Sequence, residues 1–172
     1  MAPHRICRRG IGRTFQIVRP FPNLTVRETV LVGLNFGALR QRHARLEEQC
    51  DDILEQTGLQ ALGARYGAHL TLGGRKRLEL ARALSTAPRL LMLDEVMAGL
   101  TPVEIEGALE MLRRIQQRRS ISILVVEHNL RAMMRLCSRV VVLHHGEKIG
   151  EGTPAEIARD PRVVDAYLGA SA

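Results

Sequence analysis

Three short aliphatic runs, each followed by residues with helical or turn-forming character, constrain the fold of this chain more than any other feature. The runs lie at residues 90–93, 121–126 and 140–143. A short continuous aliphatic run is typical of a strand that is buried on both faces. Strands that alternate with helices favour a parallel sheet flanked by helices, so the order predicts an α/β fold. A short returning strand is expected at residues 148–150.

Helices are expected between and before these runs. Thr25 and Glu28 have the spacing of a capping box, which predicts a helix from there to about residue 40. Residues 46–56 continue with helical periodicity. Residues 1–24 are expected to be irregular because prolines interrupt them. Further helices are expected to start near Gly73, Pro102, Asn129 and Thr153.

The composition is that of a folded domain with an aliphatic core. The chain has 172 residues, of which 45% are hydrophobic, but only 3% are aromatic and none is Trp. This length suits one domain with a substantial core rather than two domains. The three cysteines, at positions 7, 50 and 137, are isolated, which fits a reducing compartment and no CxxC metal site.

The charge balance is basic, with 25 Lys and Arg residues against 18 Asp and Glu residues. Such a balance can indicate nucleic acid or an anionic membrane surface as a partner. The arginines are scattered along the chain, which favours solvated helix faces, so no nucleic-acid partner is expected. No run reaches the ~18–20 apolar residues of a transmembrane helix, and the basic start lacks the apolar stretch of a signal peptide.

Two carboxylates, Asp94 and Glu95, directly follow the first aliphatic run. Open α/β sheets bind ligands at the carboxyl ends of their strands, where these side chains would lie. The first acid can hold Mg²⁺ directly or through water, and the second can orient and deprotonate an attacking water. Acidic pairs also end strands by chance, so this pattern alone leaves an ordinary strand end as an alternative.

Two weaker features lie on either side of the acidic pair. Residues 70–74 carry two glycines at the start of a helix, where backbone amides and the helix N-terminus can bind a phosphate. His128 follows the second aliphatic run, and a polar side chain there can reach a phosphate. In isolation, a glycine-containing helix entry and a structural histidine are the simpler interpretations.

The order of these features is more specific than any one of them. Gln16, the Gly-Gly helix, the acidic pair and His128 follow the order of the Q-loop, signature motif, Walker B motif and switch histidine. The chain therefore resembles ATP-binding cassettes, and among them the branched-chain amino acid importer ATPases. The matching segments are residues 10–16 and 24–33 (Q-loop region), 70–84 (signature helix), and 152–156 and 165–169 (tail).

The resemblance implies a partial P-loop NTPase fold with a mostly parallel sheet and a helical subdomain. A single partial cassette domain would comprise four parts. These are the Q-loop region (1–24), the helical subdomain with the signature helix (25–86), the Walker B and switch-histidine core (87–150), and the family tail (151–172).

The resemblance also implies roles for individual residues. Glu95 and His128 would be catalytic, with Glu95 acting on the attacking water and His128 contacting the γ-phosphate. Gln16 and Asp94 would contact Mg²⁺. The residues implied to bind ATP, some of them in the opposite subunit's site, are Gln16, Thr71, Gly73, Gly74 and Asp94.

The partners implied by the resemblance are transmembrane permease subunits, a second ATPase subunit in a head-to-tail dimer and, indirectly, a periplasmic or extracellular solute-binding protein. Such a subunit would be cytoplasmic and would bind the inner face of the cell membrane through the permease. ATP hydrolysis would drive uptake of branched-chain or related amino acids.

Three departures from the family pattern bear on activity. No G-x-x-x-x-G-K-[ST] phosphate-binding loop occurs in the 172 residues. Thr71 stands where the family usually has Ser, Gly74 where it usually has Gln, and Val96 where it usually has Pro. We therefore expect a chain without the front of the cassette, inactive alone, and marginally stable because its strands present apolar edges.

Two alternatives stay open. The chain can be a non-catalytic half-cassette that supplies its signature and Q-loop surfaces to an intact partner. It can also be a nucleic-acid-associated ATPase of the same superfamily, but such proteins carry long coiled coils, and no heptad run occurs here.

Overall fold

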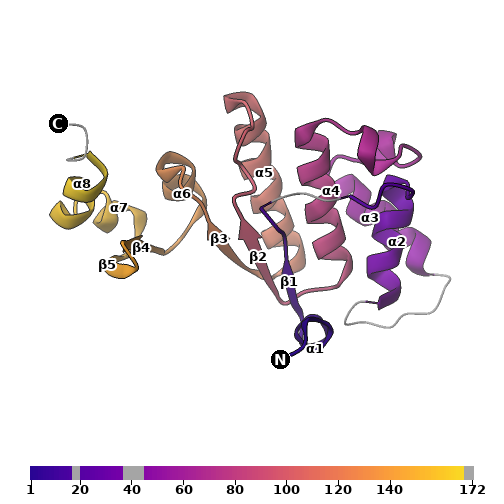
Figure 1. Ribbon diagram of the computed structural model, residues 1–172, viewed down its shortest axis with the longest axis horizontal. Coiled ribbons are helices and arrows are strands. Elements are labelled where there is room, and N and C mark those ends of the chain that lie inside the picture. The colour runs from indigo at the N-terminus through magenta and orange to yellow at the C-terminus, as the bar shows by residue number, and fades with distance from the viewer. Residues whose placement is uncertain (17–19, 37–44, 169–172) are drawn as a thin grey trace. The chain divides into compact units, whose positions relative to one another are not determined.

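The computed structural model describes residues 1–16, 20–36 and 45–168 of the chain. The chain forms two compact units, Met1–Glu127 and His128–Ala172. Figure 1 labels the helices and strands of both units. Among the described residues, no helix is both long enough and apolar enough to cross a membrane.

A parallel sheet forms the centre of the first unit. Its strands are β1 (Ile11–Arg13), β2 (Leu90–Asp94) and β3 (Ser122–Val126), in the spatial order β1-β2-β3. The middle strand buries Leu91 and Leu93, which are 0% and 1% exposed. The strands predicted at residues 90–93 and 121–126 are confirmed, as is their parallel pairing.

The prediction that residues 1–24 are irregular is wrong, because they contain helix α1 (Pro3–Arg8) and strand β1. A proline at the first helical position costs little, since the missing N–H has no partner within the helix there. Strand β1 has three residues, too few to show a period in the sequence. It forms because Gly10 accepts hydrogen bonds from the amides of Arg89 and Leu90, at 2.7 and 3.0 Å, which align it beside β2.

Strand β3 lies at the edge of the sheet in the part of the chain that the structure describes. Its Leu124 and Val126 side chains are 49% and 57% exposed. An apolar face at an unpaired sheet edge is a template for association with another chain. The expected apolar edge is therefore present at this strand.

Helices α4 (Leu72–Ser85) and α5 (Pro102–Arg119) belong to the same unit as the sheet, and α5 lies beside β2 and β3 in Figure 1. Thr71 is the N-cap of α4, and its hydroxyl accepts from the amide of Gly74 at 3.2 Å. Thr101 and Glu104 form a capping box at the start of α5, where Pro102 is the first helical residue. Both helix starts therefore have the side chains that their free backbone amides need.

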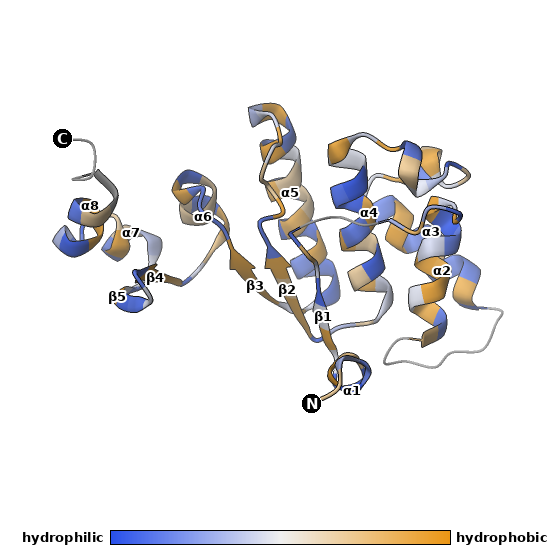
Figure 2. Cartoon of the chain, viewed as in Figure 1, coloured by the Kyte–Doolittle hydropathy of each residue, from blue (hydrophilic) through white to orange (hydrophobic). Residues whose placement is uncertain are grey.

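The predicted helical subdomain contains α2 (Val26–Phe36) and α3 (Leu46–Gln56), followed by the short 3₁₀ helices η2 (Gln60–Leu62) and η3 (Gly67–His69). Helix α2 begins where the capping box predicts, and the rest of that predicted helix, to residue 40, lies outside the described residues. Helix α2 packs against both α3 and α4. The apolar faces of these helices alternate with hydrophilic faces in Figure 2, as expected for helices with one buried side.

The second unit is built on a β-hairpin. Its elements are α6 (Leu130–Leu136), β4 (Val140–His144), β5 (Glu147–Gly152), α7 (Pro154–Ile157) and α8 (Pro161–Leu168). Strands β4 and β5 are antiparallel, so the predicted returning strand is confirmed. Within the described ranges, β4 pairs with β5 alone, and the third aliphatic run therefore does not join the parallel sheet. Val140, Val142, Ile157 and Val163 form the core of this unit.

Candidate functional site

The acidic pair lies at the carboxyl end of β2, as the sequence predicts. Asp94 is the last residue of the strand and lies opposite Val126 of β3. Glu95 leaves the sheet with a positive φ of 47°, and its amide donates to the carbonyl of Val126 at 2.9 Å. A positive φ is costly for a residue with a side chain. The turn thus directs the Glu95 side chain away from the strand path immediately after Asp94.

Gln16 is brought directly to this turn. It follows β1, the strand that pairs with β2, and its Nε2 donates to Oε2 of Glu95 at 2.7 Å. The two residues are far apart in the sequence, so their contact depends on the parallel register of β1 and β2. An amide donor on this oxygen fixes the orientation of the carboxylate.

The site contains a cation that the sequence analysis did not identify. Arg13 Nη2 lies 3.0 Å from Oδ2 of Asp94, and the Arg13 guanidinium stacks over the Phe15 ring at 5.5 Å from its centroid. Thr14 reinforces the arrangement, since its hydroxyl accepts from the amide of Asp94 at 3.2 Å. Nothing in the local spacing distinguishes Arg13 from the many other arginines, so only the tertiary contact shows its position.

Lys76 is the second missed residue. It lies one turn into α4, and its Nζ donates to the backbone carbonyl of Glu95 at 2.9 Å. Burial lowers the pKa of Lys76, and the nearby charges of Glu127 and Glu95 oppose that shift. The helix that carries the predicted signature residues is therefore hydrogen-bonded to the predicted catalytic glutamate.

Glu127 is the third missed residue, and the sequence did contain its signal. It is a carboxylate that directly follows an aliphatic run, like Asp94, but the residue predicted there was its neighbour His128. Its Oε1 accepts from the amide of Met97 at 2.7 Å, and its Oε2 is buried without a hydrogen-bond partner among the described atoms. Glu127 therefore binds the backbone of the turn at Met97, two residues after Glu95.

His128 is the first residue of the second unit, and its side chain is exposed. Asn129 follows it as the N-cap of α6, and its side chain accepts from the amide of Ala132 at 3.1 Å. His128 thus lies at the end of the second aliphatic run, where the sequence places it. Its contact with the γ-phosphate stays a prediction.

The signature residues lie at the start of α4. Thr71 is exposed, whereas Gly73 and Gly74 are buried in the first turn of the helix. A Cβ at Gly73 would lie 2.8 Å from Oε1 of Glu104, and one at Gly74 would lie 3.2 Å from the Cβ of Leu70. The glycines therefore allow close packing within this unit, and their contact with a nucleotide stays a prediction.

The residues present fit a magnesium ion only in part. Mg²⁺ in nucleotide sites usually has one or two protein oxygens, with water and phosphate oxygens as the other ligands. Asp94 and the side-chain oxygen of Gln16 are donors of this kind. No group of three or more His, Cys, Asp or Glu residues that could hold a metal occurs among the described residues. Asp94 and Gln16 thus suit an ion that arrives with phosphates.

The fold and the site define a class of protein. The chain matches the ATP-binding cassette MJ1267 in its ADP conformation with a TM-score of 0.81 and 28% identity, over 98% of this chain and 72% of that one. It matches cbiO1 of Clostridium perfringens, part of the ABC transporter complex cbiONQ, with a TM-score of 0.81 and 27% identity, over 95% and 66% of the two chains. The class is therefore that of the P-loop NTPases of the ATP-binding cassette type.

Sequence comparison gives the family. The "ABC transporter" family model matches residues 2–98, and the "Branched-chain amino acid ATP-binding cassette transporter" model matches residues 147–172. The chain is 34% identical to the high-affinity branched-chain amino acid transport ATP-binding protein BraF of Pseudomonas aeruginosa, over 96% of this chain and 70% of BraF. It is 37% identical to LivG of Salmonella typhimurium over the same shares. The chain belongs to the ABC transporter family of ATP-binding proteins.

Proposed function

We propose that this chain is part of the ATP-binding subunit of an ABC importer that takes up branched-chain or related amino acids and is driven by ATP hydrolysis. The hydrogen bond of 2.7 Å between Gln16 and Glu95 carries the proposal, because it joins a residue predicted to contact Mg²⁺ to the predicted base. The names of BraF and LivG, both branched-chain amino acid transport ATP-binding proteins, support the solute class.

The residues divide the work of hydrolysis as follows. ATP with Mg²⁺ supplies the phosphoryl group and the charge that polarises it. Glu95 accepts a proton from the attacking water, and Gln16 holds the Glu95 carboxylate in place. Asp94 would hold Mg²⁺ directly or through water. His128 contacts the γ-phosphate, and the signature residues Thr71, Gly73 and Gly74 contact the nucleotide of a second subunit.

Arg13 forms an ion pair with Asp94, the predicted metal-binding acid. Its guanidinium places a positive charge beside the Asp94 carboxylate, at 3.0 Å from Oδ2. If Asp94 Oδ2 were a ligand of Mg²⁺, the Arg13 side chain would be free to bind a phosphate oxygen, a partner that a guanidinium binds well.

The partners follow from the same proposal. A second ATPase subunit completes each nucleotide site in a head-to-tail dimer, and transmembrane permease subunits bind the helical segment of residues 25–62. A periplasmic or extracellular solute-binding protein acts indirectly, through the permease. The subunit is cytoplasmic and lies at the inner face of the membrane, with no nucleic-acid partner.

The 172 residues alone are inactive under this proposal. They contain no glycine-rich loop with Lys and Ser or Thr, so they cannot surround the phosphates with backbone amides. Equilibrium binding of labelled ATP to the purified chain tests this directly. Micromolar affinity would refute the claim, and the absence of saturable binding is the expected result.

A chimera tests the hydrolytic site itself. A segment of a relative that carries a G-x-x-x-x-G-K-[ST] loop is fused ahead of Met1, and ATP hydrolysis is measured with Mg²⁺. Activity is expected in the chimera and is expected to fall ~10²-fold or more with Glu95→Gln, because a general base contributes about that much. Glu48→Gln, an exposed position on α3, is the control and should leave the rate unchanged. Equal rates for the Glu95 and Glu48 variants would overturn the assignment.

A half-cassette function is the second candidate, favoured by the presence of the signature and Q-loop residues in a chain without the phosphate-binding loop. Such a module would supply its signature surface to an intact ATPase subunit. A pulldown of an intact cassette subunit with this chain, with and without ATP, separates the two candidates. ATP-dependent capture supports the half-cassette, and no capture excludes it.

A further inference from the structure

The first unit contains a cavity of about 800 Å³ between helices α4 and α5, near the C-terminal end of α3. Sites for small molecules commonly measure ~300–1,000 Å³ and combine an apolar body with a few polar groups. This cavity therefore has the size of a ligand site. Its chemical character decides which ligand it suits.

One face of each helix forms a wall. Helix α4 contributes Gly73, Lys76, Arg77 and Leu80, which have the i, i+3, i+4, i+7 spacing of a single helical face. Helix α5 contributes Gly107, Met111, Arg114 and Arg118, which follow the same kind of spacing along its length. The walls are thus regular helical surfaces, and they position their side chains toward a common space.

The inner surface of the cavity is apolar. Val96, Leu100, Ala108 and Met111 line it and are partly exposed, whereas the lining residues Leu80, Leu93, Leu112 and Ile115 are buried beneath. The partly exposed side chains come from helix α5 and from the loop between β2 and α5. A ligand with an aliphatic body would therefore exclude water from this surface and gain hydrophobic free energy on binding.

The polar part of the lining is mainly cationic. The basic lining residues are Lys76, Arg77, Arg114 and Arg118, against two acidic ones, Glu55 and Glu104. Arg77 donates one N–H to the carbonyl of Gly58 at 3.3 Å, and a guanidinium carries several such donors. Arginine binds a carboxylate in a fixed planar geometry, so Arg77 and Arg114 suit an anionic head group, whereas Arg118 is ion-paired with Asp52.

The cavity also reaches the candidate site of hydrolysis. Lys76 is part of its wall, and its Nζ donates to the carbonyl of Glu95 at 2.9 Å. An anion in the cavity competes with that carbonyl for the ammonium group. Occupation of the cavity would therefore weaken a hydrogen bond of the turn that carries Glu95.

We propose that this cavity is a binding site for a fatty acid or a similar carboxylate with an aliphatic tail. The tail lies against the partly exposed apolar side chains of the lining, and the carboxylate is bound by Arg77, Arg114 or both. The proposal does not depend on ATP binding, since the cavity lies entirely within the first unit and can be tested on this chain alone.

The test compares two amphiphiles with the same tail and opposite charge. Dodecanoate and dodecyltrimethylammonium, each below its micelle concentration, are titrated into the purified chain by calorimetry. Saturable binding of one dodecanoate is expected. The dissociation constant of dodecyltrimethylammonium is expected to be at least about tenfold higher. Equal binding of the two amphiphiles would overturn the proposal, because it would show adsorption to exposed apolar surface.

Variants locate the site. Gly107 lines the cavity and a Cβ there meets no described atom within 4 Å, so Gly107→Phe places a large side chain at the cavity wall with no clash at its Cβ and removes a helix-weakening glycine. It is expected to abolish dodecanoate binding while the helical circular dichroism is retained. Arg114→Gln should weaken dodecanoate binding, whereas the control Arg113→Gln, on the same helix but outside the lining, should not. Unchanged binding in a folded Gly107→Phe variant would place the ligand elsewhere and refute the site.

Discussion

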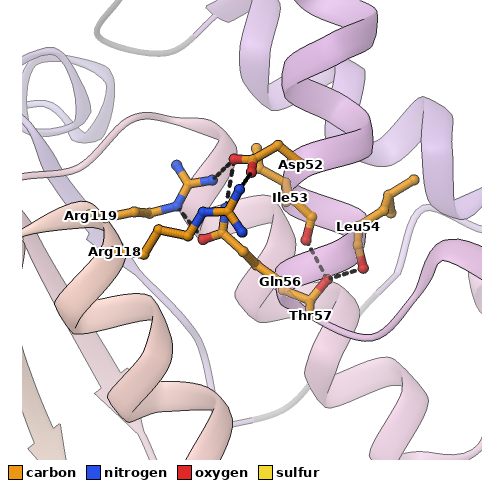
Figure 3. Close-up of polar contacts among 7 residues, drawn as sticks. All are labelled: Asp52, Ile53, Leu54, Gln56, Thr57, Arg118 and Arg119. Carbon is orange, nitrogen blue, oxygen red and sulfur yellow. Dashed lines mark hydrogen bonds and ion pairs between the residues drawn. The ribbon is translucent and has the colours of Figure 1, made fainter.

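Asp52 connects helix α3 to the C-terminal end of helix α5, and its replacement by Ala removes the centre of a polar cluster (Figure 3). Its Oδ2 accepts from Nη2 of Arg119 at 3.0 Å, and its Oδ1 accepts from Nη2 of Arg118. Arg119 Nε also donates to Oε1 of Gln56 at 2.7 Å. Asp52→Ala therefore leaves two arginines facing a helix that no longer carries their carboxylate.

The expected loss of stability follows from the exposure of each pair. The Arg118 side chain is 56% exposed, so its ion pair with Asp52 contributes ~0–1 kcal/mol. Arg119 is only 22% exposed, and burial lowers the pKa of its guanidinium, a shift that Asp52 opposes. A hydrogen bond to a charged group contributes ~1.5–3 kcal/mol, and solvent screening at the part-exposed carboxylate reduces that by about half. Asp52→Ala should therefore destabilise the chain by ~1–2 kcal/mol.

Urea unfolding followed by helical circular dichroism measures this change. Glu48→Ala is the matched control, because it removes a carboxylate from an exposed position of the same helix. A double-mutant cycle with Arg119→Met isolates the pair, and coupling of at least ~0.5 kcal/mol is expected for groups in contact. If Asp52→Ala and Glu48→Ala unfold at the same urea concentration, the cluster does not hold α3 to α5 and the reasoning fails.

Three further predictions concern packing, titration and association. Gly33→Ala should destabilise by ~1–3 kcal/mol, because its Cβ would lie 1.7 Å from Oγ of Ser85, and Ser85→Gly should restore part of the loss in thermal melts. Burial raises the pKa of Cys50 from 9.0 to about 11. Because the unfolded thiol ionises first, stability present below pH 9 should fall by ~2–3 kcal/mol toward pH 11, and Cys50→Ala should remove this dependence. Leu124→Lys with Val126→Lys at the exposed edge of β3 should reduce light scattering by the free chain, whereas unchanged scattering would place its association elsewhere.

The long elements of this fold could be predicted from the sequence because their signals are local. Helix α3 has the predicted bounds, and strands β2 and β3 lie where the aliphatic runs place them. Strand β1 could not be predicted, since its three residues gain their conformation from hydrogen bonds to β2 rather than from their own pattern. The sheet partner of β4 is likewise a non-local property, and the structure pairs it with β5.

The candidate site shows the same division. The carboxylates at the end of β2 follow from a local pattern, but the contact of Gln16 with Glu95 was implied only by resemblance to a family. Arg13 and Lys76 carry no sequence signal for their roles, because both are ordinary basic residues until the fold brings them to the acidic pair. Interactions between residues about twenty to eighty positions apart are set by strand register and helix packing, and the linear pattern does not contain them.

Glu95 is the point where three segments of the first unit meet. Its side chain is held by Gln16, its carbonyl by Lys76 of α4, and its amide by the carbonyl of Val126 in β3. The positive φ of 47° is a conformation that persists only when surrounding contacts hold it. Because Lys76 lies five residues from Thr71 on the same helix, a second subunit that binds at Thr71 and shifts α4 would change a contact of Glu95 directly. Under the proposed function, this hydrogen bond gives the signature helix a physical means of adjusting the catalytic carboxylate when the dimer closes.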